Sequence, residues 1–406
     1  MPLRSLVLIA CLVLGTTRAP AEEIPYGPPI VITKGGTYRG NWKSTNDDIP
    51  AVKIETAEPV IIENSQITGT GDLIFGRGQI ADLTVRNTSF HGLAPVDPSH
   101  LRGCGINVSQ GYRNLLVEHN FFENTSVAIK TYEYSGDGTP KNSLVIRFNR
   151  VRNIDGRRAV GKHEIVQFVA VQNYRQPIGN PAGGEIAWNE VINEPGKSCS
   201  EDLINFFKAG GRKESWFKVH DNYLHGSYPP HVLTDLSTGS GMIVDGPDNN
   251  KAAYIESYRN IVVNTTNAGM NIAAGSHIWY HDNRIISTGK TADGKWLAGS
   301  HGGVGIFDFY KDDKEYVGTM HDIVVENNVV GWAKEGYDSP YPNRNDNPAN
   351  LNGAYKSSNV SLPNAPITQA MQDEEYKTFL QRVAEAGVVI GPISPPAAGT
   401  PSISTR

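Results

Sequence analysis

The sequence predicts an all-β solenoid, in which short strands wind into stacked coils, and three observations favour this class. A short phrase centred on asparagine recurs along the chain, and glycine-led alternating segments stand between its copies. Helical patterns of about 10–15 residues between the strands are missing, which excludes βαβ architectures. The composition agrees, because 42 glycines and only 39% hydrophobic residues among 406 suit a narrow core with many turns.

Residues 1–21 have the layout of a secretory signal peptide. Arg4 precedes the apolar run 6–14, and Ala19-Pro20-Ala21 supplies a small-x-small cleavage site. This run is too short to cross a bilayer, and we expect no membrane span later in the chain. Removal of Arg4 and Arg18 changes the formal charge from −5 to −7, which disfavours nucleic acid as a partner. We therefore expect a secreted protein, either extracellular or periplasmic.

The recurring phrase is an apolar residue, two further residues, Asn, any residue and a second apolar residue. The interval of 61 residues between Asn222 and Asn283 predicts two coils, with a degenerate copy near 255–261. Each copy reads as a strand, a turn at asparagine and another strand, because asparagine tolerates the left-handed region. Stacked asparagines can also form hydrogen bonds along the stack. The phrase is centred on Asn120, Asn149, Asn189, Asn222, Asn283 and Asn328, with weaker copies at Ser65 and Thr88.

The glycine-led strands alternate, which predicts the direction of their side chains. We expect one set to point inward: Val108, Ile129, Val166, Ile204, Val244, Ile272 and Ile306. Successive coils lie about 4.8 Å apart, so their outward neighbours should form one vertical polar strip. The strip is expected to contain Lys130, Gln167, Asn205 and Asp245.

The domain prediction has three parts. The signal peptide is followed by one solenoid domain of nine or ten coils over residues 22–364, of which 332–364 are expected to be a loop. Residues 365–406 contain a helix from Ile367 to Ala386, expected to cap the open end of the solenoid, and a disordered Pro/Ser tail. Cys104 and Cys199 either pair as a disulfide or stay separate and buried.

On the asparagine repeat, residues 30–335 resemble the right-handed parallel β-helix proteins of the pectate-lyase-like superfamily. The resemblance implies a polysaccharide as the partner, and we expect a monomer. It does not choose a reaction, because the same coil carries lyases, hydrolases, epimerases and adhesins. The signatures Trp-Ile-Asp-His and Arg-x-Pro-x-x-Arg of pectate lyases are absent, as is the polygalacturonase motif set.

Charged loops beside the expected strip favour a polysaccharide lyase that cleaves a uronate-containing chain by β-elimination. That reaction needs a base for the C5 proton and a cation that neutralises the C6 carboxylate. In related families the base is commonly Lys or Arg and the neutraliser is calcium or a basic side chain. The candidate catalytic residues are Lys208, Arg212 and Asp245, and the candidate calcium ligands are Glu201 and Asp202. The candidate substrate-binding residues are Lys130, Arg158, Lys162, Gln167 and Asn205.

Two other functions stay open. A glycoside hydrolase on the same fold would use paired carboxylates, for which Asp202 and Asp245 on neighbouring coils are the candidates. A non-catalytic glycan-binding or surface adhesion protein would instead use exposed aromatic side chains. The aromatic candidates are Trp188, Tyr223, Trp279, Tyr280, Tyr310 and Trp332. His119, His220 and His281 fall inside the repeated phrase, so we expect them to pack the coil rather than bind a metal.

Overall fold

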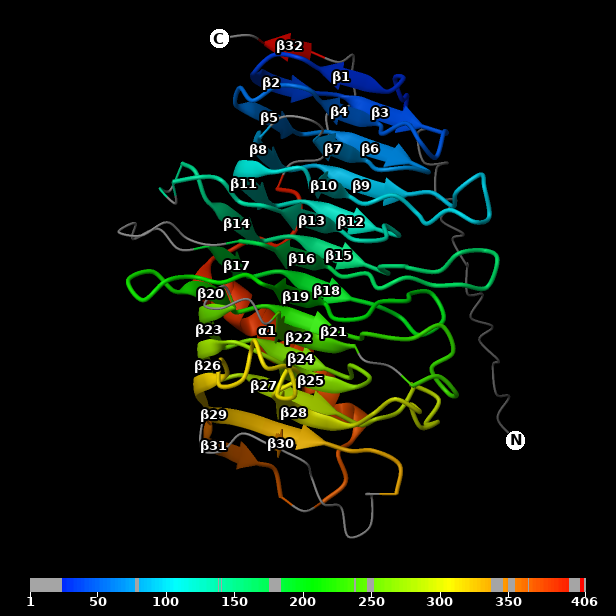
Figure 1. The fold of residues 1–406 in the computed structure, drawn as a ribbon. Coiled ribbons are helices and arrows are strands. Elements are labelled where there is room, and N and C mark those ends of the chain that lie inside the picture. The colour runs from blue at the N-terminus through cyan, green and yellow to red at the C-terminus, as the bar shows by residue number, and fades with distance from the viewer. Residues whose placement is uncertain are drawn as a thin grey trace, which may run out of the picture.

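The computed structural model of the chain is a parallel β-helix, in which coils stack in sequence order from the N-terminal to the C-terminal end (Figure 1). The structure describes residues 24–404 except 77–79, 138, 140, 175–183, 237–238, 247–251, 337–345, 350–354, 364 and 394–401. The predicted signal peptide lies outside the described residues.

Each complete coil contributes three strands, which pair in parallel with the strands of the next coil. We name the three ladders sheets 1, 2 and 3. Sheet 1 has 11 strands: β1 (Ile30–Ile32), β4 (Val52–Ile54), β7 (Ile74–Gly76), β10 (Ile106–Val108), β13 (Ile129–Tyr132), β16 (Val169–Gln172), β19 (Ile204–Phe207), β22 (Ser240–Asp245), β25 (Ala268–Ile272), β28 (Gly302–Phe307) and β30 (Asp346–Ala349).

Sheets 2 and 3 follow sheet 1 in each coil. Sheet 2 comprises β2 (Gly36–Arg39), β5 (Val60–Glu63), β8 (Ala81–Arg86), β11 (Tyr112–Glu118), β14 (Leu144–Arg147), β17 (Glu185–Ala187), β20 (Phe217–His220), β23 (Ala253–Tyr258), β26 (Ser276–His281), β29 (His321–Trp332) and β31 (Tyr355–Ser361). Sheet 3 comprises β3 (Asn41–Ser44), β6 (Gln66–Gly69), β9 (Ser89–Gly92), β12 (Phe121–Glu123), β15 (Arg150–Arg152), β18 (Glu190–Ile192), β21 (Tyr223–His225), β24 (Ile261–Val263) and β27 (Arg284–Ser287). The long strand β29 pairs with both β26 and β27 and so joins the two sheets.

The repeated asparagines stack at the corner between sheets 2 and 3. In the middle of the stack, the side-chain amide of Asn189 donates to Asn222 Oδ1 at 2.9 Å, and that of Asn222 donates to Asn260 Oδ1 at 2.9 Å. Asn260 lies inside the predicted degenerate copy, so the two coils expected in the 61-residue interval are confirmed. The same pattern continues through Asn120, Asn149, Asn283, Asn328 and Asn359.

The left-handed residue at this corner is the one before the ladder asparagine. Phe148, Trp188 and Asp221 have φ of 58°, 54° and 53°. The sequence argument assigned that conformation to the asparagine itself, which is wrong. Asparagine is needed here because its amide carries both a donor and an acceptor and can therefore bond to the coils above and below.

The core runs through the middle of the coils, and all seven residues predicted to point inward from sheet 1 are buried. The predicted polar strip is wrong in part. Lys130 and Asn205 occupy one row of sheet 1 with Ala170 between them. Gln167 stands three positions before Ala170, and Asp245 stands two positions after Ile243, the partner of Asn205. Alternation distinguishes inward from outward positions, but it cannot detect the shift of two residues at Asp245, and Gln167 lies before β16, where the alternation of the strand does not apply.

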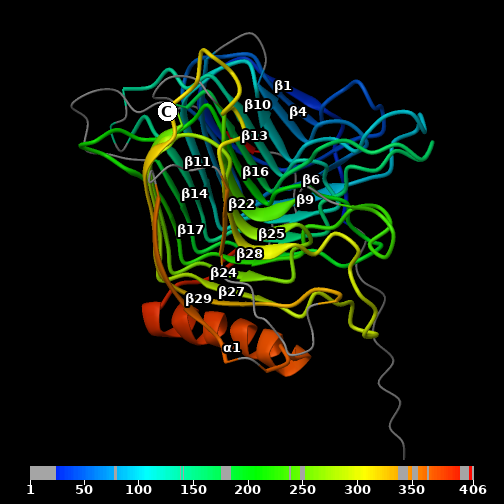
Figure 2. The same cartoon turned by 60° about the horizontal axis from the view of Figure 1, so that its bottom comes forward.

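The C-terminal helix α1 (Gln369–Ala386) agrees closely with its predicted bounds, but it does not cover the open end of the solenoid. It begins at the cap residue Thr368, ends at Gly387 with φ of 64°, and packs on the outside of β24 and β27 (Figure 2). Phe379 on α1 packs in one apolar cluster with Tyr223 and Ile261 of sheet 3. Apolar side chains on the outer surface of sheet 3 therefore direct the helix to the side of the solenoid.

The chain after α1 returns along the solenoid to its first coil. Gly391 N–H donates to Phe148 O at 2.8 Å, and Ile393 N–H donates to Asn87 Oδ1 at 3.2 Å. Strand β32 (Ser402–Ser404) then pairs antiparallel with β2, next to the N-terminal coil in Figure 1. Within the tail expected to be disordered, this strand instead covers an edge of sheet 2.

Two further expectations differ from the structure. The region 332–364 was expected to be a loop, but β30 and β31 within it add another coil, because they continue the ladders of β28 and β29. Sheet 1 accordingly has 11 strands where nine or ten coils were expected.

Cys104 and Cys199 are both free and buried, which agrees with the unpaired alternative. Among the described residues, no helix combines the length and apolar composition needed to cross a membrane.

Candidate functional site

The outer face of sheet 1 is the candidate binding surface, because loops project from both of its edges (Figures 1 and 2). Two outward rows cross the middle of this face at right angles to the strands. The first row contains Asn107, Lys130, Ala170, Asn205, Ile243 and Asn271. The second row contains Tyr132, Gln172, Phe207 and Asp245. Amide, hydroxyl and aromatic groups therefore follow one another from coil to coil.

Two carboxylates at the downstream edge of sheet 1 accept hydrogen bonds from different groups of Tyr310. The Tyr310 hydroxyl donates to Asp245 Oδ1 at 3.1 Å, and the Tyr310 backbone N–H donates to Asp308 Oδ1 at 3.1 Å. Asp245 Oδ1 also accepts from Gly246 N–H at 2.6 Å. Partial burial and the nearby Asp245 charge raise the pKa of Tyr310, so this hydroxyl remains a hydrogen-bond donor at neutral pH.

The parallel pairing of strands in sheet 1 gives the approximate distance between the Cα atoms of Asp245 and Asp308. Val244, Ile272 and Ile306 are aligned on β22, β25 and β28, so Asp245 and Asp308 stand two coils apart. Two strand spacings place their Cα atoms about 10 Å apart. Both carboxylates are half-buried, and the phenol ring of Tyr310 lies between the two contacts.

Lys208 lies at the same edge as Asp245. Its backbone N–H donates to Asp245 O at 3.0 Å, and its Nζ lies 5.7 Å from the ring centre of Phe207. Arg212 follows in the same loop, where its backbone N–H donates to Ser215 O. The three predicted catalytic residues therefore lie at or beyond one edge of sheet 1.

The other predicted charged residues lie at the opposite edge. Arg158, Lys162, Glu201 and Asp202 precede the strands β16 and β19 that Lys208 and Arg212 follow. Arg158 forms an ion pair with Glu164 at 2.8 Å, and Lys162 is exposed. Gln167, which is buried, also lies on this upstream side. The structure thus places these residues upstream of the sheet 1 strands and the predicted catalytic residues at their downstream ends, while Lys130 and Asn205 lie on the sheet between them.

Asp202 does not fit the predicted calcium site. The side chain is buried, and its Oδ1 lies 2.5 Å from Ser240 Oγ while Asn205 donates to Oδ2 at 3.4 Å. Burial, with the charge of the neighbouring Glu201, raises the pKa of Asp202 to about 8. Calcium is held by several ionised or carbonyl oxygens, whereas burial disfavours the ionised form of this carboxyl and two side chains already engage it.

The proposed hydrolase pair of Asp202 and Asp245 is also wrong. Asp202 is level with Ser240, since Leu203 N–H donates to Ser240 O and Ile204 is the partner of Met242. Ser240 and Asp245 are the two ends of β22. Five residues of extended strand cover about 16 Å. That length exceeds the ~6.5–9.5 Å that separates the carboxylates of an inverting hydrolase.

Several side chains considered for glycan stacking are unavailable to a ligand. Tyr223, Tyr280 and Trp332 are fully buried, and Trp188 packs against the cluster under α1. Trp279 lies on sheet 2, where it stacks on His281 and donates to Glu326 at 3.0 Å. Of the aromatic candidates, Tyr310 is the one that the structure places beside the carboxylates.

The three histidines of the repeated phrase pack the corner, as expected. His119 stacks on Phe148, and His220 and His281 stack on the two faces of Tyr258. The sequence argument missed the contacts of Tyr310, because the loop 308–319 folds back over two coils and no local spacing reports that path.

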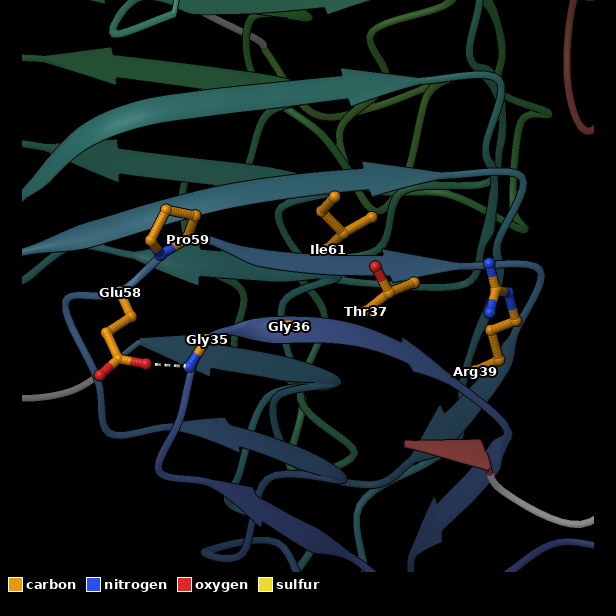
Figure 3. Close-up of a pocket in the computed structure, with 7 residues that line it drawn as sticks. All are labelled: Gly35, Gly36, Thr37, Arg39, Glu58, Pro59 and Ile61. Atoms are coloured by element: carbon orange, nitrogen blue, oxygen red, sulfur yellow. Dashed lines mark hydrogen bonds between the residues drawn. The ribbon is translucent and has the colours of Figure 1, made fainter. Parts of the chain in front are cut away.

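The described cavities lie away from this carboxylate pair. A cavity of about 690 Å³ on the first coils is lined by Gly35, Gly36, Thr37, Arg39, Glu58, Pro59 and Ile61 (Figure 3). Glu58 already accepts from Gly35 N–H at 2.6 Å, and Arg39 forms an ion pair with Glu63. A cavity of about 250 Å³ borders Cys199 and Glu201 at the upstream edge of sheet 1. The larger of these two cavities is bordered by one carboxylate, Glu58, and the smaller one by Glu164 and Glu201, of which Glu164 is already paired with Arg158.

Comparisons with known proteins give little beyond the fold. No family model matches the chain, and no curated protein matches its sequence. Among solved structures, a GH136 lacto-N-biosidase from Eubacterium ramulus is similar at a TM-score of 0.35 and 12% identity, over 73% of this chain and 47% of that one. The chain thus spans about half the length of that structure, and a likeness at this level carries no argument about activity. The fold defines a parallel β-helix protein, and neither the fold nor these comparisons assign it to the pectate-lyase-like superfamily.

Proposed function

We propose that the protein is an exported glycoside hydrolase, which holds a glycan along the outer face of sheet 1 and cleaves it between Asp245 and Asp308. The observation that carries the proposal is that one residue, Tyr310, contacts both carboxylates, Asp245 through its hydroxyl and Asp308 through its backbone N–H. Export rests on the predicted signal peptide of residues 1–21.

The rows on sheet 1 supply the groups that sugar recognition needs. The half-buried Asn205 presents an amide that can bond hydroxyl groups in either direction, and Lys130 adds a cation in the same row. Phe207, next to Asp245 on the adjacent strand, offers an apolar ring to the face of a sugar. Because the rows run from coil to coil, they suit an extended chain lying along the solenoid axis.

The carboxylates have different surroundings, which suggests different roles. Asp245 accepts hydrogen bonds from Gly246 and Tyr310, which orient it as the base that removes a proton from the attacking water. Asp308 would then protonate the leaving oxygen. A Cα separation of about 10 Å leaves room for carboxyl groups at the ~6.5–9.5 Å of inverting enzymes.

β-Elimination has less support than hydrolysis. Its predicted base and cation-binding groups lie at opposite edges of sheet 1, and Arg158 is neutralised by Glu164. Asp202 is buried and does not fit calcium. Lys208 still borders Asp245, so an elimination mechanism through Lys208 is retained as an outcome of the test.

The test is an activity panel of neutral and uronate-containing oligosaccharides and polysaccharides, with and without a chelator. We expect new reducing ends without the ultraviolet absorbance of an unsaturated uronate. Asp245→Asn and Asp308→Asn should each lower the rate by about 10³-fold, while Asp293→Asn, an exposed control, should leave it unchanged. An absorbing product that requires Lys208 would establish a lyase. Retardation in affinity electrophoresis without any product would establish glycan binding alone.

A further inference from the structure

Two histidines and an aspartate gather on sheet 2, away from the carboxylates assigned to hydrolysis. His277 is the second residue of β26, and His321 and Asp322 begin β29. Ser276 is the partner of His321, which places His277 level with Asp322 on the next coil. His321 Nδ1 lies 2.8 Å and His277 Nε2 lies 3.7 Å from Asp322 Oδ2. The ligand atoms of the three residues all lie within 4.8 Å of one another.

Neighbouring groups fix the His277 ring in one orientation. Its Nδ1 lies 3.1 Å from Ser276 Oγ, which leaves Nε2 as the nitrogen that faces Asp322. The ring also stacks on Tyr254 of the preceding coil, with centroids 4.4 Å apart. Tyr254, His277 and Asp322 share a left-handed backbone, with φ of 57°, 52° and 53°, so this corner repeats over three coils. A hydrogen-bonded and packed imidazole with its second nitrogen presented outward is the usual state of a metal-ligating histidine.

We propose that His277, His321 and Asp322 bind a divalent transition-metal ion of the zinc class. Zinc holds nitrogen and oxygen ligands at ~2.0–2.1 Å in a tetrahedron, which sets ligand atoms about 3.3 Å apart. The separations of 2.8 and 3.7 Å from Asp322 Oδ2 lie on either side of that value, and the ligand atoms of the two histidines lie within 4.8 Å of each other, so side-chain rotations would have to bring the three into place. Two imidazoles with one carboxylate favour zinc, cobalt or nickel over calcium, which prefers an all-oxygen shell.

General attraction of cations does not explain this cluster. Lys213 and Lys356 are close enough to act electrostatically on His277 and Asp322, respectively, so the surroundings are not an acidic patch. Binding would depend on directed lone pairs from three side chains. Asp322 is exposed, so the fourth coordination position opens to solvent, where a water molecule can occupy it.

The ladder asparagines also mark this site in the sequence. His277 stands six residues before Asn283, and Asp322 stands six residues before Asn328. Tyr254 stands six residues before Asn260. Residues six positions before successive ladder asparagines therefore lie next to one another in the structure, although His277 and Asp322 are 45 residues apart in the chain. Spacing rules for metal ligands within one segment cannot find such a site, because its ligands come from two coils.

The experiment is a metal titration of the full chain, without a polyhistidine tag and after removal of metals by a chelator. Zinc binding is followed by calorimetry, and cobalt binding by the visible absorption of the bound ion. We expect one ion per chain and a cobalt spectrum of four- or five-coordinate type. His277→Ala and Asp322→Asn should each weaken zinc binding by about 10- to 100-fold. The matched control is His231→Ala, which removes an exposed histidine whose Nδ1 lies 3.1 Å from Asp235 Oδ2.

Independent readouts separate the possible outcomes. Zinc should raise the melting temperature of the unmodified protein, and calcium at the same concentration should not. Circular dichroism checks that each variant is folded, and His321→Ala replaces any variant that is not. The proposal is overturned if the unmodified protein binds no zinc, if calcium competes equally, or if folded variants bind as tightly as the His231→Ala control. Because hydrolysis is assayed separately with Asp245 and Asp308, failure of either proposal leaves the other testable.

Discussion

Asn222→Ala removes one amide from the middle of the asparagine ladder. In the intact protein, Asn222 Oδ1 accepts from the backbone N–H and the side-chain amide of Asn189, at 3.0 and 2.9 Å. The Asn222 amide nitrogen donates to Ile186 O, His220 O and Asn260 Oδ1, at 2.9–3.0 Å. Asn222 and Asn189 are completely buried, so water does not reach the groups left behind without rearrangement of the coil.

The expected loss in free energy of unfolding depends on which buried groups lose a hydrogen-bond partner in Asn222→Ala. The Asn189 backbone N–H loses its acceptor, whereas the Asn189 amide keeps Ile146 O and Ala187 O, and Asn260 Oδ1 still accepts from Asn222 N–H at 3.1 Å. Each buried polar group left unsatisfied costs about 1–3 kcal/mol. Ile186 O and His220 O are backbone carbonyls, and a carbonyl has a second lone pair, so their loss contributes less. We expect Asn222→Ala to lower the free energy of unfolding by about 2–4 kcal/mol, of which the unsatisfied Asn189 N–H accounts for about 1–3 kcal/mol.

The assay is urea denaturation followed by far-ultraviolet circular dichroism, with the unmodified protein and two variants measured in parallel. Asn359→Ala is the matched control, because Asn359 occupies the last position of the same ladder and is half-exposed. Water can replace its contacts with Asn328, so we expect a loss below about 1 kcal/mol. Equal losses in the two variants, or a loss below about 1 kcal/mol for Asn222→Ala, would refute the argument from buried hydrogen bonds.

Two further predictions concern buried carboxyl groups. Glu375 on α1 accepts two hydrogen bonds from the Arg284 guanidinium, each of 2.6 Å. Glu375→Ala should therefore lower the free energy of unfolding by about 2–3 kcal/mol in urea denaturation and expose the segment after α1 to protease. An unchanged denaturation midpoint and an unchanged digestion pattern would contradict this prediction. Asp202, whose pKa is raised to about 8 by burial, binds a proton in the folded state that the unfolded chain releases above about pH 4. The stabilising contribution of this proton is therefore complete below about pH 4 and is lost as the pH rises toward 8. In thermal denaturation between pH 5 and pH 8, Asp202→Asn should show a smaller decline in stability than the unmodified protein. Identical pH profiles of the two proteins would show that Asp202 is already ionised in the folded state.

The architecture follows from the sequence, because the features that define a coil are local. The asparagine phrase marks the corner between sheets 2 and 3, and alternation identifies the inward residues of sheet 1. Thr368 and Gly387 mark the ends of α1 through contacts made within a few residues. Even the weak copy at Asn260 was placed by counting residues between Asn222 and Asn283.

The site depended on relations between coils, which local patterns do not contain. Alternation left a shift of two residues undetected, and that shift separates Asp245 from the row of Lys130 and Asn205. Loops of unequal length hid the approach of Tyr310 to Asp245, 65 residues away in the chain. The direction of α1 was decided by apolar residues on sheet 3, whose exposure depends on the assembled solenoid.

The register between neighbouring strands is the physical reason why the sequence predicts the coils but not the contacts of the site. The direction of a side chain within one strand follows from the pleat, which the sequence carries in every second residue. The neighbour of that side chain on the next coil is selected by inter-strand hydrogen bonds and by the ladder asparagines after the loops have closed. The inward residues can therefore be read from the sequence, whereas the contacts between outward residues at Tyr310 and at His277 arise only when the coils stack.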